Sequence, residues 1–151
     1  MSILVVGVGS ILCGDDAIGV RVVDELEKLS LPEDIIIHSA DISGLDLLKL
    51  FPDHEKIIVV DAADMGLTPG EVKVFDFTEI KKAKFDDSYS THGMALLETL
   101  TLAQSLDLAS NVTIVGVQPK NTGFSLYMSE EVKTQIPKIV NIVKDLVMEE
   151  K

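Results

Sequence analysis

The chain has 151 residues, 46% of them hydrophobic, and its 13 basic and 25 acidic residues give a formal net charge of −12. This length predicts a single domain, spanning 1–151, that is large enough to bury a core. The acidic balance argues against nucleic acid and anionic membrane surfaces as partners, because both would repel the chain.

Three features bear on the compartment in which the protein works. The only cysteine, Cys13, cannot form a disulfide within the chain, which favours a reducing environment. The first apolar run begins by Ile3, so we expect no signal peptide. No apolar run approaches the roughly 20 residues that span a bilayer. We therefore expect a soluble, cytoplasmic protein with no membrane insertion.

The first half of the chain alternates between apolar runs and helical patterns. The continuous run ILVVGV (3–8) predicts a strand buried on both faces. A glycine-rich loop follows, and apolar residues at helical spacing then predict a helix that starts near Ala17. Two further strands are predicted at 34–39 and 56–62, with a short helix at 45–51 between them that a proline ends.

The segment after the third strand departs from this alternation. Only about ten residues separate Asp61 from the next strand pattern, which is too few for the crossover helix that a parallel strand needs. Pro69 and Gly70 suit a tight turn, and residues 71–75 alternate in polarity. We therefore predict an antiparallel edge strand at 71–75, whose charged side chains discourage further pairing.

The second half of the chain contains two more predicted elements before its last helix. Residues 81–90, KKAKFDDSYS, are expected to form a mobile loop. A helix is expected to begin near His92, with Ser90 or Thr91 as its N-cap. The apolar run at about 112–117 predicts another strand.

The last helix is predicted to begin after Ser129 as N-cap, with two glutamates at the favourable end of the helix dipole. Pro137 is expected to kink this helix or to lie in an adjusted turn. Together the elements predict a three-layer α/β domain. Its sheet is twisted and mostly parallel with one antiparallel edge strand, and helices cover both faces.

The loop between the first strand and the first helix, VGVGSILCGDD followed by Asp16, has the shape of a nucleotide-binding loop but not its residues. Leu12 stands where the dinucleotide pattern needs its third glycine, and no Gly-Lys-Ser/Thr follows. Asp15 and Asp16 lie where a phosphate would bind a helix N-terminus, so their charges favour a cation instead. The structural alternative is that Asp15 is an N-cap and Asp16 a first-turn residue.

Three side chains are expected at one edge of the sheet. In an open α/β sheet, ligands bind beyond the carboxyl ends of the strands. Asp16 follows the first strand there, and Asp61 ends the third. The helix that begins near His92 could bring this imidazole to the same edge. Two carboxylates and one imidazole can bind a divalent metal and leave positions for water or substrate.

Each of these residues also has a structural interpretation. Asp61 could be a cap or turn former, although no helix is predicted to start there. A single histidine at a helix start, such as His92, is often a surface residue. His54 lies in the polar segment PDHEK and is expected to be solvated. His38 lies within or just after a strand, as a core or rim residue.

A nucleophilic mechanism that pairs Cys13 or Ser10 with His92 has no support from a nucleophile-elbow pattern such as G-x-S-x-G. We interpret Cys13 as a small loop residue. A nucleotide-binding function is disfavoured by Leu12 and by the aspartates of the loop.

Four segments, in this order, resemble the hydrogenase maturation endopeptidases. They are ILVVGVGSILCGDDAIGVRVV, IIVVDAADMGLTPGEVKVFD, STHGMALLETL and VTIVGVQP. The resemblance covers nearly the whole chain. The GDDAIG loop and VDAADMGLTPGE are fairly specific together, although neither is so alone.

The resemblance implies a peptidase that removes a C-terminal extension from the large-subunit precursor of a nickel–iron hydrogenase after nickel insertion. It also implies a sheet between helices. The metal-binding and substrate-recognition set of the family matches Asp16, Asp61 and His92, which would then act both as catalytic residues and as metal ligands. Nickel would be supplied by the substrate, with another divalent metal such as zinc able to take its place.

The chain departs from the family at one point. Many members carry an Asp-Gly-Gly-type stretch after the second strand, where this chain has HSADISGLD. Ser39 or Asp41 could stand in for that stretch, which leaves the roles of His38, Ser39 and Asp41 open. The alternative function is a non-catalytic, nickel-dependent assembly factor that binds the large subunit without cutting it.

Overall fold

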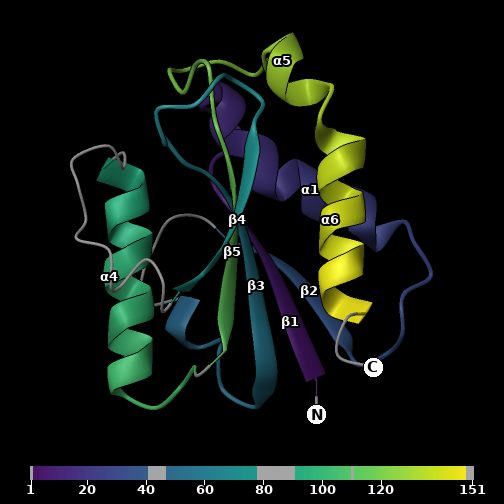
Figure 1. Ribbon diagram of the computed structural model, residues 1–151, viewed down its shortest axis with the longest axis vertical. Helices are drawn as coiled ribbons and strands as arrows, with labels where there is room; N and C mark the ends of the chain where they lie inside the picture. Colours follow the sequence, from purple (N-terminus) through teal and green to yellow (C-terminus); the bar gives the residue numbers. More distant parts are fainter. Residues whose placement is uncertain (1, 41–46, 78–90, 110, 149–151) are drawn as a thin grey trace.

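The computed structural model describes residues 2–40, 47–77, 91–109 and 111–148, with the side chains of 91–97 outside this description. Figure 1 shows the arrangement of its elements. In chain order these are β1 (Ser2–Val8), the 3-10 turn η1 (Gly14–Ala17), α1 (Ile18–Glu27), β2 (Ile35–Ala40), β3 (His54–Ala62), β4 (Val72–Asp76), α4 (Thr91–Ser105), β5 (Val112–Val117), α5 (Glu130–Lys133) and α6 (Ile136–Met148).

The five strands form one mixed sheet in the order β2-β1-β3-β5-β4. β1 pairs in parallel with both β2 and β3, and β3 pairs in parallel with β5. Only β4 is antiparallel, and it lies at the edge beside β5. The predicted mostly parallel sheet with one antiparallel edge strand is confirmed. β4 is antiparallel because the short link after β3 has no room for the crossover helix that a parallel strand needs.

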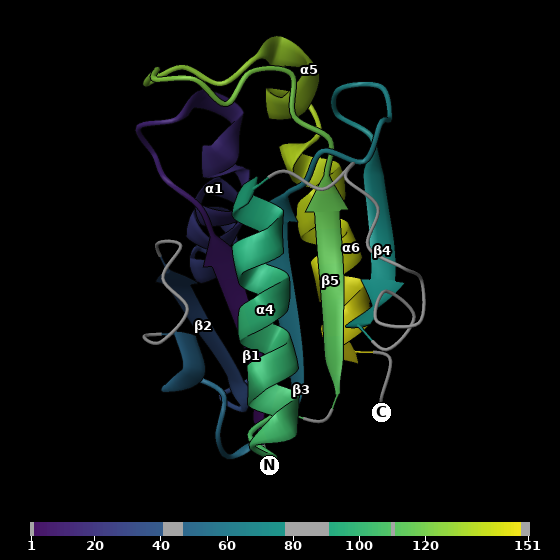
Figure 2. The same ribbon diagram turned by 90° about the vertical axis from the view of Figure 1, so that its left-hand side faces the viewer.

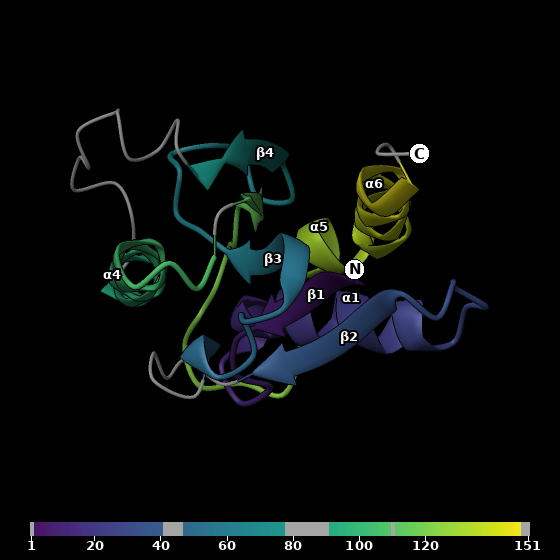
Figure 3. The ribbon, with the colours of Figure 1, turned by 90° about the horizontal axis from the view of Figure 1, so that it is seen from below.

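Helices cover both faces of the sheet. Seen from below, α1 and α6 lie on one side of the strands and α4 lies on the other (Figure 3). Alternate residues of the central strand β3 supply the two layers of core. Ile58 and Val60 pack in the layer with α1 and α6, and Ile57 and Val59 pack in the layer with α4. The predicted three-layer α/β architecture is confirmed.

The last predicted helix is divided in two. Ser129 is the N-cap of α5 as predicted, although its hydroxyl does not cap the helix. α5 ends at Lys133, and α6 starts at Ile136 with Pro137 in its first turn. Proline is tolerated there because the first-turn N–H groups have no acceptor within the helix. Of the two expectations for Pro137, a kink within one helix or a place in an adjusted turn, the structure shows the second.

Some predictions fall partly or wholly outside the described residues. The expected mobile loop at 81–90 lies outside them, as does Asp41. Of the short helix expected at 45–51, only residues 47 and 48 are described as helical. The helix expected near His92 begins at Thr91.

Candidate functional site

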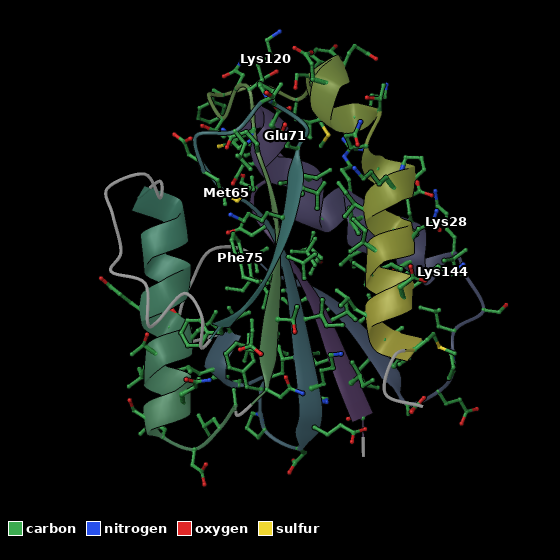
Figure 4. All side chains as sticks on the ribbon, in the orientation of Figure 1. Lys28, Met65, Glu71, Phe75, Lys120 and Lys144 are labelled. Atoms are coloured by element: carbon green, nitrogen blue, oxygen red, sulfur yellow. The ribbon has the colours of Figure 1, made fainter. Side chains whose placement is uncertain are left out.

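The loops that follow β1, β3 and β5 gather at one end of the molecule. These parallel strands end together, so their carboxyl ends form one edge of the sheet, called the carboxyl edge below. Met65, Glu71 and Lys120 mark the loops beyond it (Figure 4). This is the edge at which open α/β sheets bind ligands.

Asp16 is placed at the carboxyl edge by η1, directly after the glycine-rich loop. Its side chain is buried, with only 5% of the residue exposed. Its Oδ2 accepts a hydrogen bond from the Ser10 N–H at 3.0 Å, so the carboxylate closes the loop that leads to it. Gly9 has a φ of +144°, and a Cβ there would lie 1.9 Å from the Asp16 carbonyl oxygen. The glycine lets the loop fold tightly over Asp16.

Two glycines outside the loop, one in β1 and one in α1, pack the helix against the sheet. A Cβ at Gly7 would lie 2.1 Å from the Gly19 carbonyl oxygen, and one at Gly19 would lie 2.3 Å from the Val60 carbonyl oxygen. α1 therefore approaches β1 and β3 more closely than any side chain would allow. These two glycines are explained by packing rather than by a phosphate.

Asp61 lies near the end of β3, in the middle of the sheet. It pairs in register with Gly116 of β5 and follows Val60, which pairs with Gly7 of β1. Only 1% of Asp61 is exposed. Because η1 contacts β3, the structure brings Asp16 and Asp61 to the same edge as two buried acidic side chains.

His92 is the second residue of α4. The N-terminal end of this helix lies at the same end of the molecule as the arrowheads of β1 and β5 (Figure 2). The backbone of His92 is thus placed near the carboxyl edge, while its side chain is outside the described residues. Among the side chains that are described, no three histidine, cysteine or acidic groups gather as a metal-binding set.

Asp15 does not share the cation-binding role that was expected for it together with Asp16. Its Oδ2 accepts hydrogen bonds from the N–H groups of Lys120 and Asn121, at 2.8 and 3.0 Å. Ser129 donates its N–H to Oδ1 and its hydroxyl to Oδ2, both at 2.7 Å. Asp15 is fully buried. It therefore anchors the loop after β5, called the β5 loop below and spanning 118–129, to η1.

These contacts correct two predictions about Asp15. It is not a helix N-cap, since Cys13 holds that position for η1 and Ala17 holds it for α1. Its charge is also not offered to a cation, because four donors already surround it. Burial acts to raise the pKa of the Asp15 carboxyl, but the hydrogen bonds from Asn121, Ser129 and Lys120 together outweigh it and lower the pKa.

Gln118 is a buried residue of the site that sequence reasoning missed. Its Oε1 accepts hydrogen bonds from the N–H groups of Met65 and Leu67, at 2.7 and 3.2 Å. Its Nε2 donates to Asp64 Oδ1 and to the Pro119 carbonyl, each at 3.2 Å. Gln118 thereby fixes the loop that follows Asp61. The only sequence signal was a polar residue directly after an apolar strand.

The remaining candidates lie elsewhere or play smaller parts. His38 and Ser39 are exposed on β2. His54 was expected to be solvated but is half-buried, and its Nδ1 lies 2.6 Å from the Ser2 hydroxyl where β1 and β3 begin. Cys13 is a half-buried loop residue, and its backbone forms an isolated parallel β-bridge with that of Ser125.

Two buried carboxylates at one edge suit a cationic ligand. A divalent cation or a cationic group is the kind of ligand that pairs with carboxylates. Carboxylate oxygens are ligands for such metals.

Among the described residues, no helix combines the length and apolar composition needed to cross a bilayer.

The fold is that of an open α/β domain, a class that binds ligands beyond the carboxyl ends of its parallel strands. Comparison with known proteins is consistent with this class. The model of the hydrogenase maturation protease family matches residues 20–146. The hydrogenase maturating endopeptidase HybD of Escherichia coli superposes with a TM-score of 0.88 at 28% identity, over 99% of this chain and 94% of that one.

Two relatives in sequence agree with this match. The chain is 34% identical to the hydrogenase 2 maturation protease of Escherichia coli over 124 residues, which are 80% of this chain and 75% of that protein. It is also 34% identical to the hydrogenase expression/formation protein HupD of Rhizobium leguminosarum over 119 residues, which are 78% of this chain but only 59% of that longer protein. The chain belongs to the hydrogenase maturation protease family.

Proposed function

We propose that the chain is an endopeptidase that removes the C-terminal extension of a nickel–iron hydrogenase large-subunit precursor, in the cytoplasm and after nickel insertion. The family membership supports the class of reaction. The observation that carries the nickel dependence is the burial of Asp16 and Asp61 at one edge. Carboxylate oxygens are ligands for divalent metals, so a site with two of them suits a substrate that brings its own metal.

In this proposal Asp16, Asp61 and His92 recognise the nickel of the precursor, and zinc or another divalent ion can take its place. A bound divalent metal lowers the pKa of water and polarises a carbonyl, either of which assists hydrolysis of the scissile peptide bond. The chain supplies the anionic oxygens and the rigid loops that hold them. Ser10, through its N–H, orients the Asp16 carboxylate.

The test compares nickel-loaded precursor with the same precursor purified without nickel. We expect cleavage of the loaded form only, because the metal completes the site and stabilises the developing oxyanion. Intact mass spectrometry measures cleavage, and nickel content is measured independently. Casein and a free peptide that copies the extension serve as controls, and neither is expected to be cut.

Two results would contradict the proposal. Equal cleavage of loaded and nickel-free precursor would show that the metal of the substrate does not gate the reaction. Tight binding of the loaded precursor without any cut would instead support a non-catalytic assembly factor.

A further inference from the structure

Apolar side chains crowd onto the two loops beside the candidate site. The described residues expose ten large hydrophobic side chains, and five of these lie on the loop after β1 or on the β5 loop. We call these five residues the apolar patch: Ile11, Leu12, Phe124, Leu126 and Tyr127. The other five exposed side chains are spread over four other parts of the chain.

The aromatic members of the patch are almost fully exposed. Phe124 is 89% exposed and Tyr127 is 85% exposed. Exposed aromatics are costly in water and are enriched where proteins bind one another. Large exposed apolar patches mark interaction sites on proteins that are otherwise polar.

Hydrogen bonds hold the two loops together. The Ser125 N–H donates to the Leu12 carbonyl, and the Gly14 N–H donates to the Ser125 carbonyl, each at 2.9 Å. Within the β5 loop, the Tyr127 N–H donates to the Ser125 hydroxyl at 3.0 Å. The loops run side by side at the upper end of the molecule in both side views (Figures 1 and 2). The patch is therefore displayed on an ordered backbone rather than on a loose loop.

The patch is also tied to the site. η1 carries Asp15, which anchors the β5 loop, and next to it Asp16, which accepts the Ser10 N–H of the other loop. A protein that binds the patch is thus held at a fixed position relative to Asp16. Such pre-organisation is how an enzyme aligns a remote part of its substrate with the reacting bond.

We propose that the apolar patch docks the folded large-subunit precursor, through an apolar surface of the precursor near its C-terminal extension. This inference rests on the proposed function, because the occupant is the substrate of that reaction. The patch binds the body of the precursor, while the carboxyl edge receives its metal and the bond to be cut.

Size and charge favour the precursor over a second copy of this chain. A full aromatic side chain presents about 150–250 Å², so Phe124 and Tyr127 together expose on the order of 350 Å². Stable partners bury about 800 Å² each, so the patch needs the neighbouring site to complete an interface. A second copy would also bring the same net charge of −12, which opposes self-association.

The experiment measures binding and cleavage separately. The variant Phe124→Ala/Tyr127→Ala removes both aromatics, and Leu29→Ala/Leu106→Ala removes two exposed apolar side chains at the ends of α1 and α4, away from the carboxyl edge. Biolayer interferometry gives the Kd for immobilised nickel-loaded precursor, and intact mass gives kcat and KM. Melting curves check that all variants fold.

We expect the aromatic variant to raise Kd and KM at least tenfold with kcat unchanged, because interface aromatics are typical hot spots. The control variant should bind like the parent. An unchanged Kd for the aromatic variant would overturn the docking proposal. So would concentration-dependent self-association of the parent, by sedimentation, that only the aromatic variant loses. If the parent binds the precursor through the patch but does not cut it, the proposed function fails and the docking proposal stands.

Discussion

At the scale of single residues, the two neighbouring aspartates of the glycine-rich loop divide two tasks. Asp15 accepts four hydrogen bonds from the β5 loop and fixes its position. Asp16 lies at the carboxyl edge with Asp61. The sequence shows two equivalent carboxylates, and only their partners distinguish them.

Replacing Asp15 should destabilise the protein in a pH-dependent way. Asp15→Asn loses the charge and turns an amide donor towards N–H groups, so we expect a loss of about 1.5–3 kcal/mol in the free energy of unfolding at pH 7. The pKa of Asp15 is lowered on folding from its ordinary value of 3.8. Its stabilisation is therefore fully present above that value and is lost as the pH falls through the lower, folded value.

Urea unfolding between pH 7 and pH 2 measures this difference. The difference in the free energy of unfolding between the parent and Asp15→Asn should become smaller as the pH falls below the ordinary pKa of the carboxyl. The control is Asp24→Asn, at an exposed position of α1, which should follow the parent throughout. If this difference in the free energy of unfolding stays constant from pH 7 to pH 2, the charge of Asp15 contributes nothing to stability.

The proposed site residues should matter for activity and not for folding. Asp16→Asn, Asp61→Asn and His92→Ala should each abolish processing of nickel-loaded precursor, because asparagine keeps the shape but removes the anion that a cation needs. Intact mass measures processing, and the melting temperature checks the fold. Any of these variants that processes at the parental rate would be removed from the site.

At the scale of elements, the loop after β3 depends on one side chain of the β5 loop. Gln118→Leu leaves the Met65 and Leu67 N–H groups without the acceptor they have now. We expect a loss of about 1–3 kcal/mol in the free energy of unfolding, and faster hydrogen exchange at both amides. Gln118→Glu keeps the acceptor but places a second carboxylate beside that of Asp64, so like-charge repulsion should make it at least as destabilising as Gln118→Leu at pH 7.

The matched control for this pair is Gln104→Leu, in α4 and away from the loop. It should leave exchange at Met65 and Leu67 unchanged. If Gln118→Leu also leaves their exchange unchanged, another contact holds the loop that follows Asp61.

At the scale of the whole molecule, one sheet joins two layers of core. Ile139 of α6 and Leu100 of α4 are both fully buried, on opposite faces. We expect Ile139→Val to cost about 0.5–1.5 kcal/mol and Leu100→Ala about 2–5 kcal/mol. The double variant should lose the sum within about 0.5 kcal/mol, because the sites share no contact.

Urea unfolding followed by fluorescence and by circular dichroism measures these values. All variants should unfold in one transition that both probes report alike. Two separated transitions would show that the layers unfold as independent units, contrary to a single domain.

Much of the architecture could be predicted because its signals are local. β1, β3 and β5 appear as continuous apolar runs, and the short link before β4 allows only an antiparallel return. The expectation that Asp16 and Asp61 share an edge follows from the same rule, since Asp61 lies near the end of a parallel strand and Asp16 lies in the loop region that follows another. His54 shows the limit, because its partner Ser2 lies on a neighbouring strand and is 52 residues away in the chain.

The sequence by itself determined the strands, the layers and the two acidic residues at the carboxyl edge, because apolar periodicity and link length act between near neighbours in the chain. The tertiary structure alone decided that Asp15 anchors the β5 loop, that Gln118 holds the loop after Asp61 and that Phe124 and Tyr127 lie exposed beside the site. The physical reason is sequence separation. Asp15 and Ser129 are 114 residues apart, and no local pattern records a hydrogen bond that exists only once the sheet has brought its loops together.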